Sequence, residues 1–125
     1  MNLLPHLSTL ASAYDVLLCD VWGVLHNGVT AFAGPCDALM RMRARGGVVV
    51  LITNSPRPSE QVSRQLARLQ VPAKTYDAIV SSGDVTRGVI QARPGQSLFH
   101  MGPKRDSSIF TGLDVRFAPL ESADY

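Results

Sequence analysis

The residues of this chain that could do chemistry lie directly after three short apolar runs. They are Asp20 with Trp22 and Gly23, Thr53 with Asn54, and the polar cluster at 81–84. A carboxylate can act as a nucleophile or bind a metal ion, whereas a hydroxyl or an amide can hydrogen-bond a phosphate group. Taken alone, Asp20 has three open roles: nucleophile, metal ligand, or polar residue that ends a strand.

The apolar runs themselves predict buried strands at 15–20, 48–53 and 76–81. Between and after them, helical patterns cover 34–47, 58–70 and 85–92. This alternation predicts an α/β fold with a Rossmann-like parallel sheet and helices on both faces. Because ligands bind at the carboxyl ends of the strands in such sheets, the three polar groups should share one edge.

Weaker patterns complete the expected element order. Residues 3–12 predict a short amphipathic helix, and Asn27-Gly28 predicts a small hairpin with a type I′ turn. Two further strands are expected at 96–102 and 113–120, with a polar loop at 103–108 between them. Arg41, Arg43 and Arg45 alternate along the helix at 34–47 and are expected on its solvated face.

Composition excludes several classes of protein. The chain has 125 residues, is 46% hydrophobic, and carries a formal charge of +2, which is too small to indicate nucleic acid or an anionic membrane as partner. No apolar run approaches the ~20 residues of a membrane span, and the N-terminus lacks a signal peptide pattern. Cys19 and Cys36 are too few for a disulfide scaffold and favour a reducing, cytoplasmic environment. His26 and His100 have no partners at zinc-ligand spacing.

Two stretches together resemble one known family. "CDVWGVLHNG" and "VVVLITNSPRPSEQV" are similar to the first two motifs of the haloacid dehalogenase-like (HAD) superfamily. The resemblance is to class IIA, which carries a large α/β cap after the second motif and includes nitrophenyl- and sugar-phosphatases. It implies a HAD-like core over residues 1–83 and the beginning of the cap over 84–125, with the boundary near Ser82 to Val85.

The resemblance also implies a mechanism and a set of site residues. Asp20 matches the nucleophile that forms an aspartyl-phosphate, and it matches a Mg²⁺ ligand together with the backbone carbonyl of Trp22. Thr53 matches the hydroxyl that hydrogen-bonds the transferring phosphoryl group. Backbone N–H groups at Asn54 and Gly23 would help to bind the phosphate oxygens. The implied substrate is a small phosphorylated metabolite.

The chain departs from the family pattern in two ways. Trp22 stands where the family usually has an aspartate that acts as general acid and base. The family's lysine and second acidic motif are expected beyond "PLESADY", so the chain resembles an N-terminal part that runs into the cap. Asp84 and Lys104 are weaker matches to those two motifs, and a helix cap and a surface lysine are the simpler interpretations.

Three hypotheses therefore stay open. The protein is a Mg²⁺-dependent phosphatase, an inactive or incomplete phosphate-binding module, or a chain that does not fold stably alone. The third hypothesis follows because missing strands would expose a sheet edge and an apolar face. The same surfaces, or the cap, could support a homo-oligomer.

Overall fold

The computed structural model describes residues 6–125, which divide into two compact units. The first unit contains the residues up to Thr53 together with Glu60–Val80. The second contains Asn54–Ser59 together with Ser81–Tyr125. Each unit has its own cluster of buried apolar side chains. No helix among residues 6–125 is both long and apolar enough to cross a membrane.

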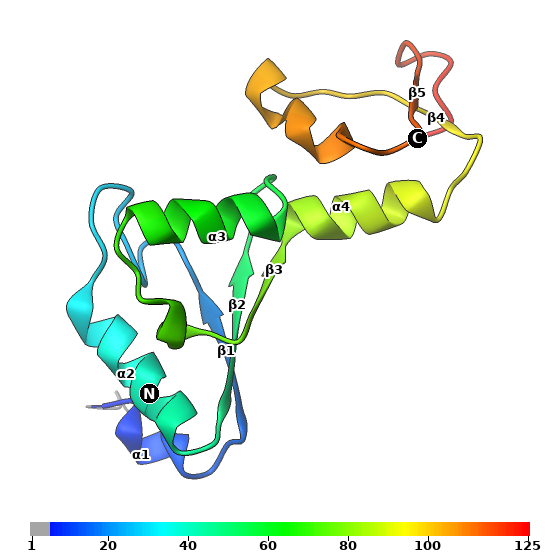
Figure 1. The fold of residues 1–125 in the computed structure, drawn as a ribbon. Helices are drawn as coiled ribbons and strands as arrows, with labels where there is room; N and C mark the ends of the chain where they lie inside the picture. The colour runs from blue at the N-terminus through cyan, green and yellow to red at the C-terminus, as the bar shows by residue number, and fades with distance from the viewer. Residues whose placement is uncertain (1–5) are drawn as a thin grey trace, which may run out of the picture. The chain divides into compact units, whose positions relative to one another are not determined.

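The elements from the N-terminus to the third strand alternate as the sequence predicted. They are α1 (Ser8–Ala11), β1 (Val16–Asp20), α2 (Ala33–Ala44), β2 (Val48–Thr53), α3 (Ser59–Arg68), the 3₁₀ helix η1 (Ala73–Thr75) and β3 (Ala78–Ser81). The strands form one sheet in the order β1-β2-β3, and β1 runs parallel to β2 with Val16 opposite Val48 (Figure 1). The predicted α/β fold with a parallel sheet is confirmed.

An aspartate just before β3 ties the start of that strand to the start of β2. Asp77 N–H donates to the Val49 carbonyl at 2.8 Å, and Val49 N–H donates to Asp77 Oδ2 at 2.8 Å. Arg43 of α2 donates to the Asp77 carboxylate and to the Lys74 carbonyl. The expectation that Arg43 is solvated is therefore wrong. Its guanidinium forms an ion pair with Asp77, and both side chains are only partly exposed.

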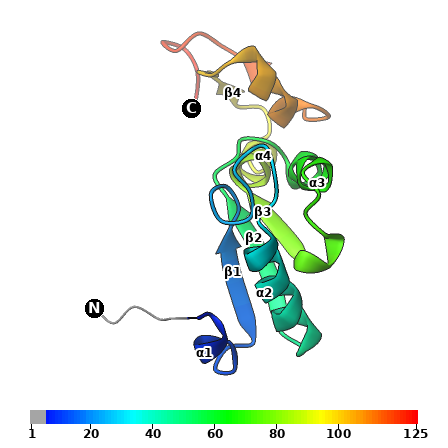
Figure 2. The same ribbon diagram turned by 90° about the vertical axis from the view of Figure 1, so that its left-hand side faces the viewer.

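The helices α2 and α3 cover one face of this sheet (Figure 2). The core there includes Leu39 and Met42 of α2, Val49 and Leu51 of β2, and Val62 and Leu66 of α3. On the opposite face Val16, Leu18, Val48 and Ile52 stay exposed. The sequence predicted helices on both faces, and this part of the prediction is wrong for the residues that the structure describes. A continuous apolar strand indicates that both faces become buried, but it does not say by which segment.

The second unit consists of a longer helix and short elements. They are α4 (Ser82–Gln91), β4 (Ser97–Leu98), the 3₁₀ helix η2 (Lys104–Phe110) and β5 (Arg116–Phe117), with β4 parallel to β5. Its buried apolar residues are Ile90, Leu98 and Ile109. The strands predicted at 96–102 and 113–120 are two residues long each, and the predicted loop at 103–108 lies within η2 except for its first residue.

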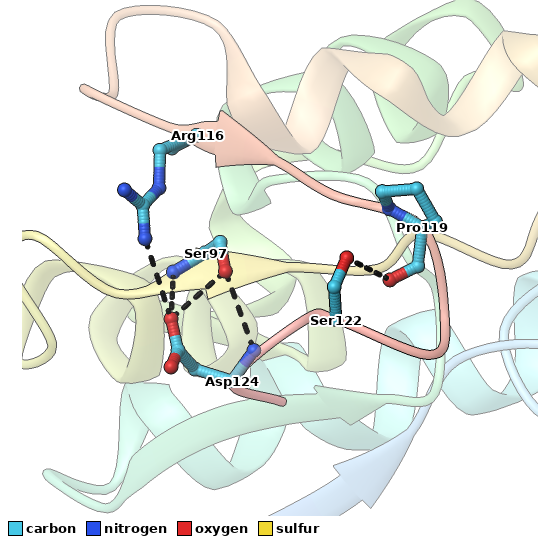
Figure 3. A network of polar contacts seen from close by, with 5 residues as sticks. All are labelled: Ser97, Arg116, Pro119, Ser122 and Asp124. Carbon is cyan, nitrogen blue, oxygen red and sulfur yellow. Dashed lines mark hydrogen bonds and ion pairs between the residues drawn. The ribbon is translucent and has the colours of Figure 1, made fainter.

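Polar contacts hold the end of the chain to β4 (Figure 3). Ser97 donates to Asp124 Oδ2 from both its N–H, at 2.6 Å, and its hydroxyl, at 2.8 Å. Arg116 lies 3.6 Å from the same carboxylate oxygen. These bonds, with the Arg116 ion pair contributing, lower the pKa of Asp124 although burial opposes the shift.

Two predicted helices begin at different residues from those expected. The helix predicted at 3–12 is α1 at Ser8–Ala11, and the first five residues of the chain lie outside the described residues. The helix predicted at 85–92 begins at Ser82. The earlier start has a local cause, because Ser81 Oγ accepts a hydrogen bond from Asp84 N–H at 3.1 Å and so caps the helix.

Candidate functional site

Asp20 is the last residue of β1, and its side chain is exposed. It lies opposite Ile52, the residue before Thr53 at the end of β2. Since adjacent strands are about 4.8 Å apart, the ends of the two strands are neighbours at one edge of the sheet. The pleat places Asp20 on the open face, whereas Thr53 belongs to the covered face and is only 7% exposed.

The loop after Asp20 is stabilised by hydrogen bonds within its own backbone. Val21 and Leu25 are buried, and Leu25 N–H donates to the Val21 carbonyl at 2.9 Å. Gly23 has a φ of +79°, which glycine adopts without a steric penalty. Its N–H donates to the His26 carbonyl at 2.8 Å. The hydrogen bond from Gly23 N–H to phosphate stays a prediction. It would require the hydrogen bond from Gly23 N–H to the His26 carbonyl to be shared or broken.

The predicted type I′ turn at Asn27-Gly28 is wrong. Such a turn needs a positive φ at both residues, but Gln70 alone among the described non-glycine residues has one. Gly28 does have a φ of +89°. The turn is stabilised by a side chain instead, because Asn27 Oδ1 accepts hydrogen bonds from the N–H groups of Val29 and Thr30, each at 2.9 Å.

His26 has a structural role that the sequence reasoning missed. It is buried, its Nδ1 accepts a hydrogen bond from Gly28 N–H at 2.9 Å, and its backbone pairs with Trp22. Burial lowers the pKa of His26, and an Nδ1 acceptor requires the neutral ring with its proton on Nε2. The signal in the sequence was local, since a histidine two residues before a turn glycine can accept that glycine's N–H.

Trp22 lies on the surface of the same loop, with 65% of its area exposed. Its indole Nε1 is 3.7 Å from the position that a Cβ atom would take on Gly28, so the ring lies close to this glycine. An indole cannot transfer a proton near neutral pH. Asp20 is therefore followed by an exposed aromatic surface where a second carboxylate would be needed for acid–base chemistry.

The polar residues of the second unit are arranged around the start of α4. Asn54 is exposed, and Gly83 N–H donates to the Ser55 carbonyl at 3.1 Å. Asp84 lies in the first turn of α4 and accepts hydrogen bonds from Ser81 and Ser59. This agrees with the simpler interpretation of Asp84 as a helix-capping residue.

Metal-binding side chains do not gather into a cluster in the described part of the chain. Residues 6–125 contain no group of three or more His, Cys, Asp or Glu side chains that could hold a metal ion. Cys19 and Cys36 are free thiols, and burial raises the pKa of both. Lys104, the weaker match to a phosphate-binding lysine, is exposed at the start of η2.

A comparison with known protein families identifies the family of this chain. A sequence model of haloacid dehalogenase-like hydrolases matches residues 17–116, a stretch that begins before Asp20 and includes Thr53 and Asn54. The chain belongs to the haloacid dehalogenase-like hydrolases. The resemblance inferred from the two sequence motifs is thereby confirmed.

Solved structures of other haloacid dehalogenase-like hydrolases agree with this assignment. A hydrolase of this family from Brucella suis is 46% identical, with a TM-score of 0.85 over 97% of this chain and 44% of that one. A possible sugar phosphatase of the superfamily from Cytophaga hutchinsonii is 21% identical, with a TM-score of 0.69 over 94% of this chain and 42% of that one.

A hypothetical protein from Pyrococcus horikoshii is 20% identical, with a TM-score of 0.61 over 83% of this chain and 40% of that one. At such low identity, the Cytophaga and Pyrococcus structures show the fold alone. Among curated protein sequences, none matches significantly. The chain spans less than half the length of these three solved structures.

Proposed function

We propose that this protein is a magnesium-dependent phosphatase of small phosphate esters, with Asp20 as its nucleophile. The observation that carries the proposal is the position of Asp20 at the carboxyl end of β1, beside the end of β2, in a chain of this hydrolase family. The carboxylate is exposed, so a substrate can reach it. The similar fold of the Cytophaga protein, a possible sugar phosphatase, favours the same reaction class.

The proposed reaction has two steps. An Asp20 carboxylate oxygen attacks the phosphorus, the bond from phosphorus to the ester oxygen breaks, and the leaving group keeps the electron pair. Water then attacks the phosphorus of the aspartyl-phosphate, which releases phosphate and restores the Asp20 carboxylate. The proposed hydrogen-bond donors to the phosphoryl oxygens are the backbone N–H of Asn54 and the Thr53 hydroxyl, which would have to reach past the end of β2 from the covered face.

The oxygen donors near Asp20 fit a magnesium ion. The Asp20 carboxylate and the Trp22 main-chain carbonyl are hard oxygen ligands, which this ion prefers. Mg²⁺ commonly keeps several waters and binds through one or two carboxylates plus substrate phosphate, so the lack of a three-residue cluster among residues 6–125 is compatible with it. When bound, the ion offsets the negative charge of the carboxylate and the phosphate.

Trp22 restricts the range of phosphate esters that the proposed enzyme should hydrolyse quickly. Because its indole cannot protonate the leaving oxygen, esters whose leaving group is stable as an anion should react faster than alkyl phosphates. The same residue favours a second candidate function, a module that binds phosphate without turning it over. That candidate keeps the Asp20 and Thr53 site but lacks the proton transfer.

The proposal is tested by hydrolysis of 4-nitrophenyl phosphate with and without Mg²⁺. We expect Mg²⁺-dependent turnover that Asp20→Asn lowers by about 10³-fold or more, since a missing nucleophile has no substitute. Asp15→Asn is the matched control, because Asp15 immediately precedes the opposite end of β1. Equal activity of Asp20→Asn and wild type would overturn the nucleophile assignment. Phosphate binding without turnover would favour the binding module.

The substrate, the cellular compartment and the oligomeric state are further parts of the same proposal. The substrate would be a small phosphorylated metabolite, and the two free thiols suit a reducing, cytoplasmic environment. The exposed apolar residues of β1 and β2 would be covered by further polypeptide or by a second copy of the chain. Size-exclusion chromatography with light scattering distinguishes a monomer from a homo-oligomer.

A further inference from the structure

The segment Asn54–Ser59 follows Thr53 directly, and it is held by one carboxylate. Ser59 N–H donates to Asp84 Oδ2 at 2.9 Å and to Oδ1 at 3.2 Å. The hydroxyl of Ser81, which is fully buried, donates to Asp84 Oδ2 at 2.9 Å. Asp84 thus bonds the first residue of α3 from a position inside the first turn of α4.

The neighbouring glycine fixes the other end of the same segment. Gly83 N–H donates to the Ser55 carbonyl at 3.1 Å. A Cβ atom on Gly83 would lie 2.4 Å from the Pro56 carbonyl oxygen and 2.6 Å from the Arg57 carbonyl carbon. The backbone of residues 55–57 therefore packs directly against Gly83, closer than any other residue type would allow.

The electrostatics of Asp84 suit this role at neutral pH. Burial alone would raise its pKa, but the hydrogen bonds from Ser59 and Ser81 together lower it. The carboxylate is ionised when it accepts these bonds, and charge-assisted bonds are roughly twice as strong as neutral ones. Both carboxylate oxygens accept hydrogen bonds, which agrees with the capping role.

We propose that Asp84 is a positioning residue, which holds the segment Asn54–Ser59 in the conformation that presents the Asn54 backbone to phosphate. The inference rests on the proposed function, because it assumes that Asn54 binds phosphate. Asp84 does not itself touch the reacting atoms. It acts through Ser59 and through Gly83, whose N–H bonds Ser55 beside Asn54.

The test compares Asp84→Ala and Asp84→Asn with Asp114→Asn, a matched control at an exposed acid of the same unit. Three quantities are measured: amide hydrogen exchange of Ser59, the dissociation constant for inorganic phosphate with Mg²⁺, and KM and kcat for 4-nitrophenyl phosphate. We expect Asp84→Ala to raise the Ser59 exchange rate, the dissociation constant and KM by about 10-fold each, or about 1.4 kcal/mol. The value of kcat should change much less, as expected when uniform binding is lost.

The conservative variant separates positioning from general instability. Asp84→Asn keeps an oxygen that can accept the Ser59 N–H, so it should restore part of the exchange protection and part of the phosphate affinity. It also keeps the test informative if Asp84→Ala does not fold. Asp114→Asn should match wild type in all three measurements.

The inference and the proposed function fail in different ways. Unchanged Ser59 exchange in Asp84→Ala would overturn the inference, as would faster exchange with unchanged phosphate affinity and KM. Absence of turnover by wild type would contradict the phosphatase, and the phosphate dissociation constant would then decide the role of Asp84. If wild-type protein does not bind inorganic phosphate, the inference is also overturned, because the segment Asn54–Ser59 would then have no phosphate to bind.

Discussion

The two units of this protein position their polar residues by different means. In the first unit, Asp20 and Thr53 end strands that pack on a large apolar core, whose buried residues come mainly from α2, β2, α3 and the loop after β1. In the second unit only Ile90, Leu98 and Ile109 form the buried cluster among the described residues. Aspartates supply much of the remaining order there, since Asp84 and Asp124 each accept hydrogen bonds from a serine hydroxyl and a serine N–H.

This difference indicates which changes each unit should tolerate. A strand in a large core is placed by many small contacts, so its position resists the loss of any one polar bond. A segment that is held by a few carboxylates depends on each of them and on their charge. The expected effects of mutations and pH therefore differ between the units, and the difference can be measured.

The largest expected effect is the removal of a core side chain from the first unit. Leu51 is fully buried at the centre of β2, so Leu51→Ala should lower the free energy of unfolding by about 2–5 kcal/mol. Leu98→Ala makes the same chemical change in β4 and should cost less, because fewer buried neighbours surround it. Urea denaturation followed by circular dichroism gives both values, and equal losses would contradict the comparison.

Two glycines of α4 provide the next test. Gly83→Ala forces a Cβ atom against the main chain of residues 56–57, which should cost about 1–3 kcal/mol. In the same helix, no atom from beyond the local helix backbone lies within 4 Å of the Cβ position of Gly88, so Gly88→Ala should stabilise the helix by up to about 1 kcal/mol. Thermal unfolding should show a lower Tm for the first variant and an unchanged or higher Tm for the second. A neutral Gly83→Ala would show that residues 56–57 move easily.

The sequence predicted the first unit better than the second for a physical reason. The apolar runs at β1 and β2 fix strand identity and direction, so the shared edge of Asp20 and Thr53 followed from the pattern. The two-residue strands and η2 of the second unit have little periodicity, and they depend on contacts between distant residues such as Ser97 and Asp124. The hydrogen bond between Asp84 and Ser59 joins residues far apart in the sequence, so composition and spacing could not predict it, unlike the local bond between His26 and Gly28.

A third test uses pH, since the pKa of Asp77 is lowered by its hydrogen bonds from Arg43 and Val49, against the effect of burial. A carboxyl with a depressed pKa in the folded state stabilises the protein above its unfolded pKa, near 3.9. This stability is lost as the pH falls through the folded value, because the unfolded state binds more protons. Asp84 and Asp124 shift in the same direction, so the whole chain should lose stability in acid.

Asp77→Asn isolates the contribution of the first unit to this acid sensitivity. The variant should be less stable than wild type at pH 7, and the difference should shrink as the pH falls toward 3. Urea midpoints at several pH values measure it, with Asp37→Asn as a control at an exposed ion pair that contributes little. A constant difference between Asp77→Asn and wild type across this range would mean that the charge of Asp77 does not stabilise the fold.

The smallest expected effect is at Asp124, although its hydrogen bonds resemble those of Asp84. Both carboxylates receive a serine N–H and a serine hydroxyl, but Asp84 is half-buried whereas Asp124 is exposed. Asp124→Asn should therefore raise amide hydrogen exchange at Ser97 while the Tm of the protein stays almost unchanged. Glu121→Gln, an exposed acid in the same segment, should affect neither quantity. A clear drop in Tm for Asp124→Asn would show that the contact between Ser97 and Asp124 supports the whole second unit, and that the two aspartates are equivalent.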